Sequence, residues 1–585
     1  MGLENLPSPI VCELDYKTDA IYNMEKNLNE KQLKYILEYP TVYIVNDKVG
    51  PQRFSVYIGE TTNIKRRSFE HLQSDPIARS DWKKLADSST AKMFVIGHDH
   101  FNKSLTLDIE NKLMQYMSSV GMVGSVYNRR YNQQNQYYTS DELDSIFSKI
   151  WQKLHNKNKE LFPVESVIRD SAIFKASPFH KLTQEQMDAK ELIIMKIEQA
   201  LNRQEDSQLI LVQGEAGSGK TVLMSSLFYE LQNISKENDN VILQGLSCYL
   251  LVNHEEQVKV YEQIATKLGI RTKSNKDVVS KPTHFINVND PEEKIDVVLI
   301  DEAHLLLTQG KQSYRGKNHL KDILDRAKVV VAVFDKNQIL TTEQYWESNE
   351  LLSIVHKVNL QGNLINLGNQ LRINAGKETI DWIRNIVDDQ QITNIPTDTT
   401  GYDLEVFADV EKMYEAVRKK AENEDSGISR ILATFDWPYS NQNKPKNDDY
   451  WRVKIGKWSL PWNLQLKSPK RTRINKQLSW AEQSQTINEV GSTYTIQGFD
   501  LNYAAIIIGP SVKYRDGKVI FDKKASKNKK ATQKRGGKKD VAEDLLKNEL
   551  NVLLTRGVNG LYIYAVDDEL QNMLLKAQRG ELKNE

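Results

Sequence analysis

The sequence predicts a multi-domain α/β protein in which a small mixed α/β unit precedes two parallel-sheet domains. Its 585 residues exceed what one hydrophobic core supports and correspond to about four units of roughly 150 residues. From about residue 180 onward, short apolar runs alternate with helical stretches, which is typical of parallel strands covered by helices on both faces. Earlier in the chain, β-prone runs joined by turn residues and followed by helices indicate the smaller mixed domain.

The composition excludes several classes of protein. Lys and Arg number 79 against 78 Asp and Glu, and apolar residues make up 39%, which supports folded cores and excludes wholesale disorder. Two cysteines, Cys12 and Cys248, are too few for a disulfide scaffold or a Cys-rich zinc module. There is no uncharged apolar run of the roughly 18 residues that a membrane span needs, and the first residues lack a secretion signal. We therefore expect a soluble, cytoplasmic protein with no membrane partner.

The order of helical and β-prone runs predicts five segments. These are an amino-terminal helical extension (1–38), a small mixed domain (39–135), a helical linker (136–178), a first parallel-sheet domain (179–345) and a second one (346–585). The strands expected in the two sheets are 209–212, 241–243, 297–300 and 329–334, then 431–434, 504–508 and 561–565. The linker is expected to be a helix over 140–159, because its apolar residues recur at helical spacing.

One segment carries most of the basic charge. Residues 511–540 have a local charge of +9, so the other residues together carry −8. The runs KKASKNKK (523–530) and KRGGKK (534–539) lack apolar periodicity and are typical of a flexible basic loop. Such an insertion could follow the phosphates of a nucleic acid, or it could simply keep the protein soluble.

A phosphate-binding loop is the most specific motif. An apolar strand leads directly into GEAGSGKT at residues 214–221, and an apolar helix follows. The candidate loop glycines are Gly214, Gly217 and Gly219. Glycines let successive backbone N–H groups converge on phosphates, and the helix start adds partial positive charge. Lys220 would reach the β- and γ-phosphates of a nucleotide and Thr221 would bind Mg²⁺. The alternative, a glycine turn before an ordinary helix, fits this strand–loop–helix context less well.

An acidic strand end supplies the expected partner of that loop. In DVVLIDEAH, residues 296–304, an apolar strand ends in two adjacent carboxylates. Asp301 would hold Mg²⁺, and Glu302 would orient and deprotonate the attacking water. A strand that ends in acids is weak evidence alone, but it becomes strong evidence downstream of a phosphate loop.

Together with the motifs around them, these two runs resemble a superfamily 1 helicase motor, which implies two RecA-like domains, ATP and Mg²⁺. The supporting motifs, in order, are LTQEQ (182–186), VAVFDKNQ (331–338), LGNQLR (367–372), GSTYTIQGFD (491–500) and VLLTRG (552–557). The resemblance implies that Gln186 reads adenine and that Gln338 senses the γ-phosphate. It also implies that Arg372 and Arg556 stabilise charge on that phosphate when the cleft closes.

Within helicases, the chain resembles the schlafen-group-3-like bacterial family over about residues 179–567. This resemblance rests on ATFDW (433–437), LPWN (460–463), QGF (497–499) and LLTRG (553–557). It implies a motor that acts on nucleic acid, DNA in preference to RNA. A role in antiphage defence or DNA processing follows only by analogy with nuclease–helicase fusions.

Six residues in the amino-terminal region form an ordered series. Tyr43 and Tyr57 lie on paired candidate strands, Arg67 and His71 share one helix face, Glu110 lies on a later helix and Asn128 closes the set. The series resembles a GIY-YIG nuclease domain over about residues 39–135, although the first triplet is Thr-Val-Tyr rather than Gly-Ile-Tyr. Taken singly, the tyrosine pair is typical of cross-strand packing and a helical Glu of a solvated face.

The GIY-YIG resemblance implies a metal-dependent endonuclease. Glu110 would hold one divalent ion, Mg²⁺ or Mn²⁺, against the scissile phosphate, and Arg67 would clamp the phosphate oxygens. A tyrosinate from Tyr43 or Tyr57 would help to deprotonate water, with its pKa lowered by Arg67, the metal or His71. An alternative of another class is an ATP-driven switch or scaffold whose amino-terminal domain binds nucleic acid without cutting it. A translocase that does not separate strands is a third possibility.

Overall fold

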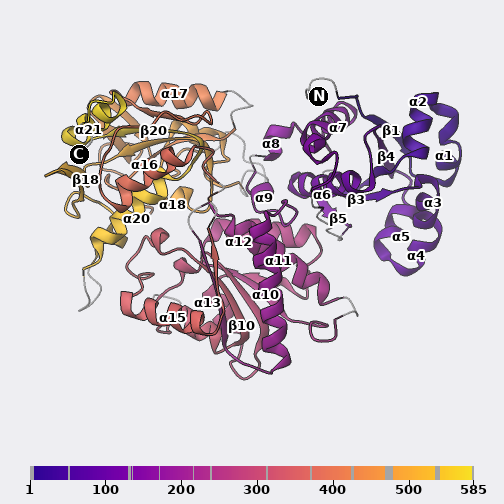
Figure 1. Cartoon of the computed structure of the whole chain (residues 1–585), viewed down its shortest axis with the longest axis horizontal. Helices are drawn as coiled ribbons and strands as arrows, with labels where there is room; N and C mark the ends of the chain where they lie inside the picture. Colours follow the sequence, from indigo (N-terminus) through magenta and orange to yellow (C-terminus); the bar gives the residue numbers. More distant parts are fainter. Residues whose placement is uncertain are drawn as a thin grey trace. The chain divides into compact units, whose positions relative to one another are not determined.

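The computed structural model describes residues 6–50, 53–128, 134, 136–169, 171–214, 217–236, 240–310, 314–368, 370, 372–422, 427–467, 478–533 and 540–582. The chain divides into two units, which Figure 1 shows coloured along the sequence. Unit 1 comprises Met1–Thr183, Ser225–Asn233 and Val260–Val279, and unit 2 comprises the rest of the chain. Within the described ranges, no helix is long and apolar enough to cross a membrane.

Unit 1 is built on a five-stranded sheet with the strand order β1-β4-β2-β3-β5. The strands are β1 (Ile10–Asp15), β2 (Thr41–Lys48), β3 (Phe54–Thr61), β4 (Lys92–Gly97) and β5 (Val123–Val126). β3 pairs with β5 in parallel, and the other neighbours pair antiparallel. The predicted hairpin is therefore present as β2 and β3, inside the sheet.

Helices cover both faces of this sheet. The α-helices that follow β3 in this part of unit 1 are α3 (Ile64–Phe69), α4 (Asp75–Ala78), α5 (Ser80–Asp87), α6 (Lys103–Ser119), α7 (Leu143–Lys157), α8 (Glu165–Arg169) and α9 (Ala172–Lys175). Because side chains alternate along a strand, Tyr43 and Val45 of β2 point to one face, where they pack in a cluster with Trp82 of α5. In Figure 1, α3, α4 and α5 are grouped together, apart from α6 and α7.

The prediction for the amino-terminal end of this unit needs correction. Residues 1–38 are not purely a helical extension, because β1 pairs antiparallel with β4 as an edge strand. The helical part after β1 is broken into short pieces: α1 (Thr18–Tyr22), a 3₁₀ turn (Met24–Asn27), α2 (Glu30–Leu33) and a π turn (Lys34–Glu38). The break has a local cause, since Asn29 and Gln32 form a capping box that starts a new helix.

The predicted linker helix is α7, and it packs against other elements of unit 1. Its apolar face, including Phe147 and Trp151, is buried. The rings of Phe147 and Trp151 lie 4.6 and 4.9 Å from the ring of Tyr116 on α6, measured between centroids. An apolar stripe of this width is stable only when it is buried, so the helix belongs to the core that it covers.

Unit 2 contains two larger sheets. The first has the order β11-β6-β10-β9-β7-β8, and its strands are β6 (Gln208–Gly214), β7 (Cys248–Val252), β8 (Val279–Ser280), β9 (Ile295–Asp301), β10 (Ala327–Phe334) and β11 (Leu364–Leu367). The second has the order β12-β20-β17-β13-β16, with β12 (Asp403–Val406), β13 (Ser429–Ala433), β16 (Val490–Gly491), β17 (Leu501–Ile508) and β20 (Gly557–Ala565). Parallel pairing runs through both sheets, as predicted.

Helices alternate with these strands. They are α10 (Gln184–Asn202), α11 (Lys220–Ile234), α12 (Glu255–Lys267), α13 (Pro282–Val288), α14 (His319–Leu324), α15 (Ser348–Leu360), α16 (Lys377–Asp388), α17 (Val410–Glu422), α18 (Thr493–Ile496), α20 (Ala542–Leu554) and α21 (Asp568–Gln578). The strands between them are almost entirely buried, which explains why they read in the sequence as continuous apolar runs.

One strand prediction and one domain boundary in this region are wrong. Residues 241–243 form a turn in which Val241 is 85% exposed, and the strand follows later as β7. The boundary expected at residue 345 falls too early, because β11 pairs in parallel with β6 and so completes the first sheet. Short apolar runs do not identify strands on their own, since only tertiary pairing decides which run is buried.

The basic insertion is ordered over most of its length, contrary to the flexible loop expected from the sequence. It contains a hairpin of β18 (Val512–Arg515) and β19 (Lys518–Phe521), followed by the short helix α19 (Lys529–Thr532). The second basic run, 534–539, lies outside the described residues. A lysine-rich segment without apolar periodicity can still be held in one conformation by buried hydrogen bonds, which the sequence pattern does not reveal.

An aromatic cluster holds a second hairpin on the second sheet. The hairpin consists of β14 (Arg452–Ile455) and β15 (Trp458–Pro461). Trp462, which follows it, is fully buried; its ring centroid lies 4.8 Å from that of Phe435, and its indole N–H donates to Pro438 O at 3.2 Å. The hairpin therefore depends on one large side chain.

We expect Trp462→Ala to destabilise this part of unit 2 by about 3–5 kcal/mol, because the substitution leaves a large cavity. Hydrogen exchange of the β14 and β15 amides should accelerate, while Trp462→Phe should have a smaller effect. Equal exchange in the wild type and Trp462→Ala would contradict this assignment.

Candidate active sites

The glycine loop that follows β6 has a backbone that requires glycine. Gly217 and Gly219 have φ values of 92° and 74°, in the left-handed region that other residues seldom adopt. A Cβ atom on Gly214 would lie 2.5 Å from the Ser218 hydroxyl oxygen. Glu215 and Ala216 lie outside the described residues. The three predicted loop glycines therefore have distinct steric reasons to be glycine, as a backbone cradle for phosphates requires.

Lys220 begins α11 and is buried in the same place. Its Nζ donates to Gly214 O at 2.7 Å and lies 3.7 Å from Asp335 Oδ2. Burial lowers the pKa of Lys220. The side-chain amide of Gln338 donates to the same Asp335 Oδ2 atom at 2.8 Å. Asp335 thus joins the loop lysine to the predicted γ-phosphate sensor, a role the sequence did not assign to it.

The acidic pair lies at the carboxyl end of β9. Asp301 is fully buried and accepts a 3.0 Å hydrogen bond from the backbone N–H of Glu302. Glu302 has φ 52° and ψ 49°, a left-handed conformation that costs a non-glycine residue of order 1–3 kcal/mol. Its Oε2 is buried without a hydrogen-bond partner in the described part of the chain and lies 3.4 Å from His304 Nε2. Burial lowers the pKa of His304, which favours the neutral ring.

Both late arginines lie at this site. A Cβ on Gly217 would lie 2.5 Å from the Cβ of Arg372, so Arg372 packs directly on the glycine loop. Its Nε is 2.7 Å from Asp500 Oδ1. Arg556 is fully buried, donates from Nε to Val552 O at 3.0 Å and from Nη1 to Phe499 O at 3.3 Å, and leaves Nη2 without a hydrogen bond among the described residues. Burial, with Arg372 nearby, lowers the pKa of Arg556 to about 10.

The remaining predicted nucleotide residues have separate positions. Gln186, near the start of α10, is buried and donates to Ser218 O at 3.1 Å, so it lies against the glycine loop. Thr221 follows Lys220 in α11 and is half-buried. Neighbouring Glu185 accepts the backbone N–H of Gly368 at 2.7 Å, which ties α10 to the segment after β11.

Two asparagines on α20 connect the second sheet to the Gln338 segment. The Asn548 amide donates to Lys336 O at 3.2 Å and to Ile339 O at 2.9 Å. The Asn551 amide donates to Asn337 O at 3.1 Å. These carbonyls flank Gln338, and α20 ends just before Arg556. Apart from the position of both asparagines just before the LLTRG run, nothing in the sequence predicts this contact.

The residues present fit a nucleoside triphosphate with Mg²⁺. Two buried polar atoms, Glu302 Oε2 and Arg556 Nη2, have no hydrogen-bond partner in the described ranges, although buried polar atoms are nearly always paired. A phosphate oxygen and a polarised water would complement a guanidinium and a carboxylate respectively. Asp301 and Thr221 supply the oxygen ligands that Mg²⁺ prefers.

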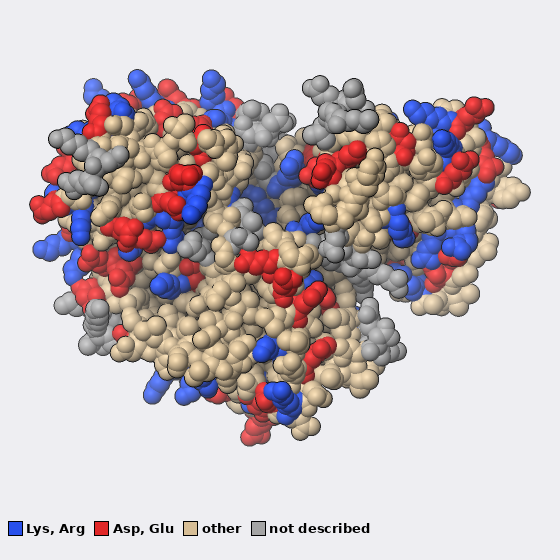
Figure 2. All heavy atoms as spheres, in the orientation of Figure 1, with Lys and Arg blue, Asp and Glu red and all other residues tan. Residues whose placement is uncertain are grey.

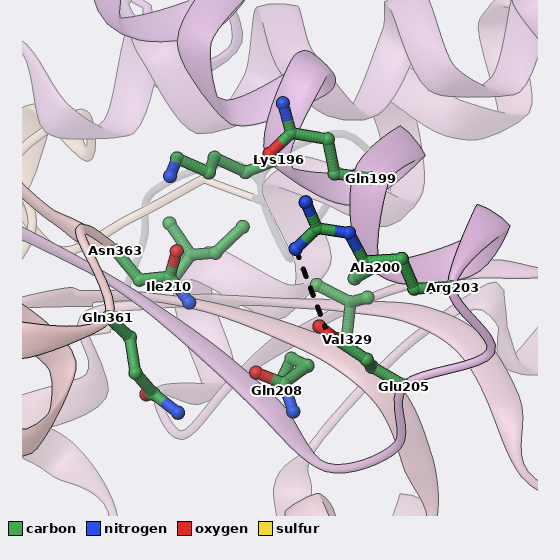
Figure 3. Close-up of a pocket in the computed structure, with 10 residues that line it drawn as sticks. All are labelled: Lys196, Gln199, Ala200, Arg203, Glu205, Gln208, Ile210, Val329, Gln361 and Asn363. Carbon is green, nitrogen blue, oxygen red and sulfur yellow. Dashed lines mark ion pairs between the residues drawn. The ribbon is translucent and has the colours of Figure 1, made fainter.

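A separate hollow of about 320 Å³ lies at the opposite edge of the first sheet, where β6 begins and residue 363 precedes β11 (Figure 3). Its lining is polar and of mixed charge, and Arg203 and Glu205 in it are 3.9 Å apart. The residues that line it include none of the predicted nucleotide residues. The candidate nucleotide site is therefore at the carboxyl ends of the strands, the edge at which parallel sheets bind ligands.

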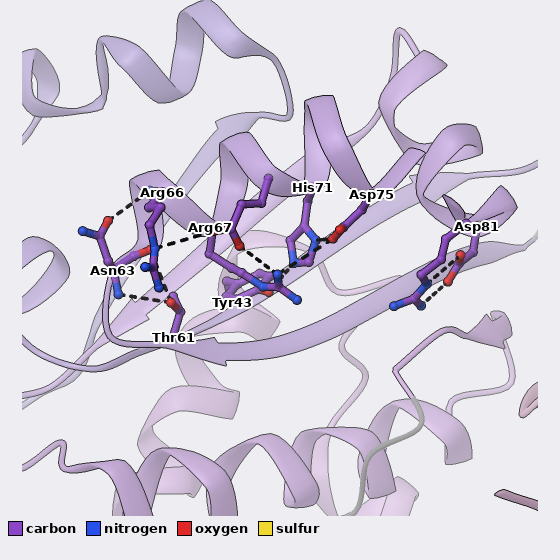
Figure 4. Close-up of polar contacts among 10 residues, drawn as sticks. Tyr43, Thr61, Asn63, Arg66, Arg67, His71, Asp75 and Asp81 are labelled. Carbon is purple, nitrogen blue, oxygen red and sulfur yellow. Dashed lines mark hydrogen bonds and ion pairs between the residues drawn. The ribbon is translucent and has the colours of Figure 1, made fainter. Parts of the chain in front are cut away.

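Unit 1 brings together the aromatic and basic residues of the predicted amino-terminal series (Figure 4). The Tyr43 hydroxyl is 2.7 Å from His71 Nε2, and His71 Nδ1 contacts Asp75. The Tyr43 and Tyr57 rings are stacked with centroids 6.1 Å apart. Arg67 Nη1 donates to Glu70 at 2.9 Å and also lies 3.9 Å from Asp75 Oδ2. The Tyr–His–Asp chain resembles an oriented acid–base relay in its geometry.

Burial determines the protonation states in this cluster. Burial, with Arg67 nearby, lowers the pKa of His71 to about 4, so the ring is neutral near pH 7. With Nδ1 donating to Asp75, Nε2 of the neutral ring accepts a hydrogen bond from the Tyr43 hydroxyl. Burial raises the pKa of Tyr43, whereas Arg67 acts to lower it. His71 also stacks on Trp82 at 3.6 Å between ring centroids.

Glu110 and Asn128 form the second part of the series. Asn128 Nδ2 donates to Glu110 Oε1 at 2.6 Å and to Ile58 O at 2.7 Å, which fixes the carboxyl beside β3. Burial, with Glu60 nearby, raises the pKa of Glu110 to about 8. Oε2 of Glu60 is itself buried without a hydrogen bond among the described residues. Glu60 Oε1 pairs with Lys103, and the described ranges hold no cluster of three or more metal-ligand side chains.

A match to a family model covers most of unit 2. The model described as Schlafen group 3, DNA/RNA helicase domain, matches residues 207–567, more than half of the chain. The chain belongs to the schlafen group 3 helicase family. The match extends from β6 to the end of β20 and includes the glycine loop, the acidic pair and both arginines. It begins after Gln186 and after the whole Tyr43 cluster, so it bears on the nucleotide site alone.

A eukaryotic relative of this schlafen group 3 protein is also known. An uncharacterized protein of Saccharomyces cerevisiae is 34% identical over 403 residues, which cover 63% of this chain and 84% of the yeast protein. Its name assigns no activity. The family assignment therefore supports a nucleic-acid helicase or ATPase, without deciding between DNA and RNA.

Three residues around the unit 1 series are not predicted from the sequence: Asp75, Trp82 and Glu60. Asp75 had a signal, because it lies four residues after His71 on a helical stretch. Trp82 and Glu60 had none, because their proximity depends on packing of α5 and on the register of β3.

We expect Arg556→Gln to lower kcat for ATP hydrolysis by at least about 10²-fold with little change in KM, because a cleft arginine acts on charge that develops in the transition state. Steady-state kinetics on the full chain measures both values, and Arg579→Gln, on the exposed end of α21, is the matched control. A fall of less than about tenfold in kcat would remove Arg556 from the machinery.

We expect Gly59→Ala to destabilise unit 1 by about 1–3 kcal/mol, since the new Cβ would lie 2.5 Å from Tyr43 Cζ and the hydroxyl oxygen. The clash displaces Tyr43 from His71. Gly121→Ala is the control, because nothing lies within 4 Å of its Cβ position. Thermal unfolding should separate the two variants, and equal melting would refute the close approach.

Proposed function

We propose that the chain is an ATP-dependent nucleic-acid helicase or translocase with a fused, metal-dependent endonuclease of the GIY-YIG type. The observation that carries the motor is the convergence of Lys220, Glu302, Arg372 and Arg556 on one site in unit 2. Family membership over residues 207–567 supports the same reading and fits two RecA-like domains. The endonuclease rests on the Tyr43 cluster and Glu110 in unit 1.

In the motor, the loop amides and Lys220 hold the phosphates, and Gln186 recognises adenine. Thr221 and Asp301 hold Mg²⁺, which neutralises charge on the phosphates when bound. Glu302 orients the attacking water and accepts its proton, for which its buried Oε2, without a hydrogen bond among the described residues, is suited.

Two arginines stabilise the phosphate that leaves: Arg372 follows β11 of the first sheet, and Arg556 precedes β20 of the second. Arg372 and Arg556 present guanidinium groups to the γ-phosphate, and Gln338 registers its presence through Asp335. Asn548 and Asn551 then transmit that state to α20. The family is consistent with either DNA or RNA as the partner. We propose DNA as the preferred substrate.

In the nuclease, Arg67 binds the scissile phosphate and Glu110, held by Asn128, binds one Mg²⁺ or Mn²⁺. Tyr43 takes a proton from the attacking water as it passes its own to His71 Nε2, and Asp75 stabilises the imidazolium that forms. The 2.7 Å contact between the Tyr43 phenol and the neutral His71 ring supplies the route for this transfer. Tyr57 packs beside Tyr43 and supports its position.

A cytoplasmic location and a role in antiphage defence or DNA processing remain predictions from the sequence. A pure switch or scaffold would need the nucleotide site without the Tyr43–His71–Asp75 relay. The presence of that relay favours cutting over simple retention of nucleic acid.

We expect three substitutions to separate the activities of the full chain. Lys220→Ala should abolish ATP hydrolysis, whereas Arg67→Ala and Glu110→Gln should abolish metal-dependent nicking and leave hydrolysis intact. ATPase assays and gel-based nicking assays with DNA and RNA, with and without Mg²⁺ or Mn²⁺, provide the readouts. Nicking that persists in both unit 1 variants would favour the scaffold alternative.

A further inference from the structure

The lysines of the basic insertion are presented outward from a buried polar anchor. Ser526, Asn528 and Ala531 are buried, whereas the lysines between and around them are exposed. The exposed lysines are Lys523, Lys524, Lys527, Lys529 and Lys530. This alternation gives the segment one face turned to the protein and one face of ammonium groups turned to solvent.

Asn528 is the centre of the anchor. Its amide donates to Glu549 Oε2 of α20 at 3.0 Å, and its carbonyl oxygen accepts the Tyr494 hydroxyl at 2.8 Å. Glu549 is fully buried and also accepts the backbone N–H of Phe435 at 2.6 Å. Burial, with Asp436 nearby, raises the pKa of Glu549 to about 8. A buried network of this kind fixes the backbone that carries the lysines.

Further contacts fix the segment on both sides of Asn528. The backbone N–H of Lys527 donates to Phe435 O at 3.0 Å, and that of Thr342 donates to Lys530 O at 3.0 Å. Lys530 Nζ lies 4.5 Å from the centroid of the Tyr494 ring. The insertion is therefore attached both to the segment after Gln338 and to the GSTYTIQGFD run that contains Tyr494.

Three of the exposed ammonium groups are not neutralised. Lys523 pairs with Asp540, but Lys524, Lys527 and Lys529 have no ion pair with any residue that the structure describes. On the face drawn in Figure 2, Lys and Arg are mixed with Asp and Glu. Unpaired like charges held together on a rigid segment repel one another, and a polyanion relieves that repulsion. A solubilising loop needs no such anchor.

We propose that Lys524, Lys527 and Lys529 form a phosphate-contact surface for the backbone of a nucleic acid bound to unit 2. The contact is to phosphodiester charge and is independent of base sequence. The occupant follows from charge complementarity and from the helicase family of the chain, so the inference rests on the proposed motor function. The anchor contacts Tyr494 and the segment after Gln338. The lysine surface is therefore attached to elements that also reach the nucleotide site.

The test is the salt dependence of oligonucleotide binding by the full chain. Fluorescein-labelled oligothymidylate and oligouridylate are titrated between about 50 and 200 mM salt into the wild type and a Lys524→Gln, Lys527→Gln, Lys529→Gln variant. Three lost contacts should reduce the slope of log K against log salt by about 2, at roughly 0.7 per phosphate on a single strand. The substituted side chains are exposed and the anchor is kept, so thermal unfolding should not change.

The matched control is Lys377→Gln, Lys412→Gln, Lys419→Gln, which removes the same charge from exposed positions on α16 and α17. An unchanged slope in the insertion variant, or an equal change in the control, would overturn the proposal. Absence of any binding by the wild type would instead refute the motor function on which it rests. ATPase assays add a second readout: the KM for oligonucleotide should rise in the insertion variant while basal kcat stays the same.

Discussion

The nucleotide site of unit 2 is organised by the cost of burying charge. Lys220, Arg372 and Arg556 lie at one site with four carboxylates: Asp335 and Asp500 form ion pairs with them, and Asp301 and Glu302 lie nearby. Burial lowers the pKa of both Lys220 and Arg556, because removing a cation from water disfavours its charged form. The proposed triphosphate would add negative charge beside these cations, so its binding and the contact between the two sheets would favour each other.

The same constraint explains why the surrounding backbone is fixed so firmly. Glu302 is held in a left-handed conformation, and its strain persists only because the buried end of β9 dictates the direction of the chain. Asn548 and Asn551 form hydrogen bonds between α20 and the backbone carbonyls around Gln338, and Arg556 follows the end of the same helix. The charged groups can then respond to a phosphate as a set, because rigid elements join them.

Unit 1 handles buried charge in the opposite manner, by keeping its groups neutral. His71 is neutral near pH 7, Tyr43 keeps its proton, and Glu110 has a pKa of about 8. The sequence placed Tyr43, His71, Glu110 and Asn128 in one ordered series, and in the structure Tyr43 contacts His71 and Asn128 contacts Glu110. It did not reveal Asp75, Trp82 or Glu60, whose contacts arise from packing between segments.

The sequence by itself determined the alternation of strands and helices in unit 2, the glycine loop, the acidic strand end and the arginine before β20. These features are local: each depends on residue types at fixed spacing. Only the tertiary structure decided that residues 10–15 form an edge strand of the sheet in unit 1, that 241–243 is a turn and that the lysine-rich segment is anchored. Each of these depends on which partner buries a segment, and a buried hydrogen bond such as that of Asn528 to Glu549 joins residues that no periodicity connects.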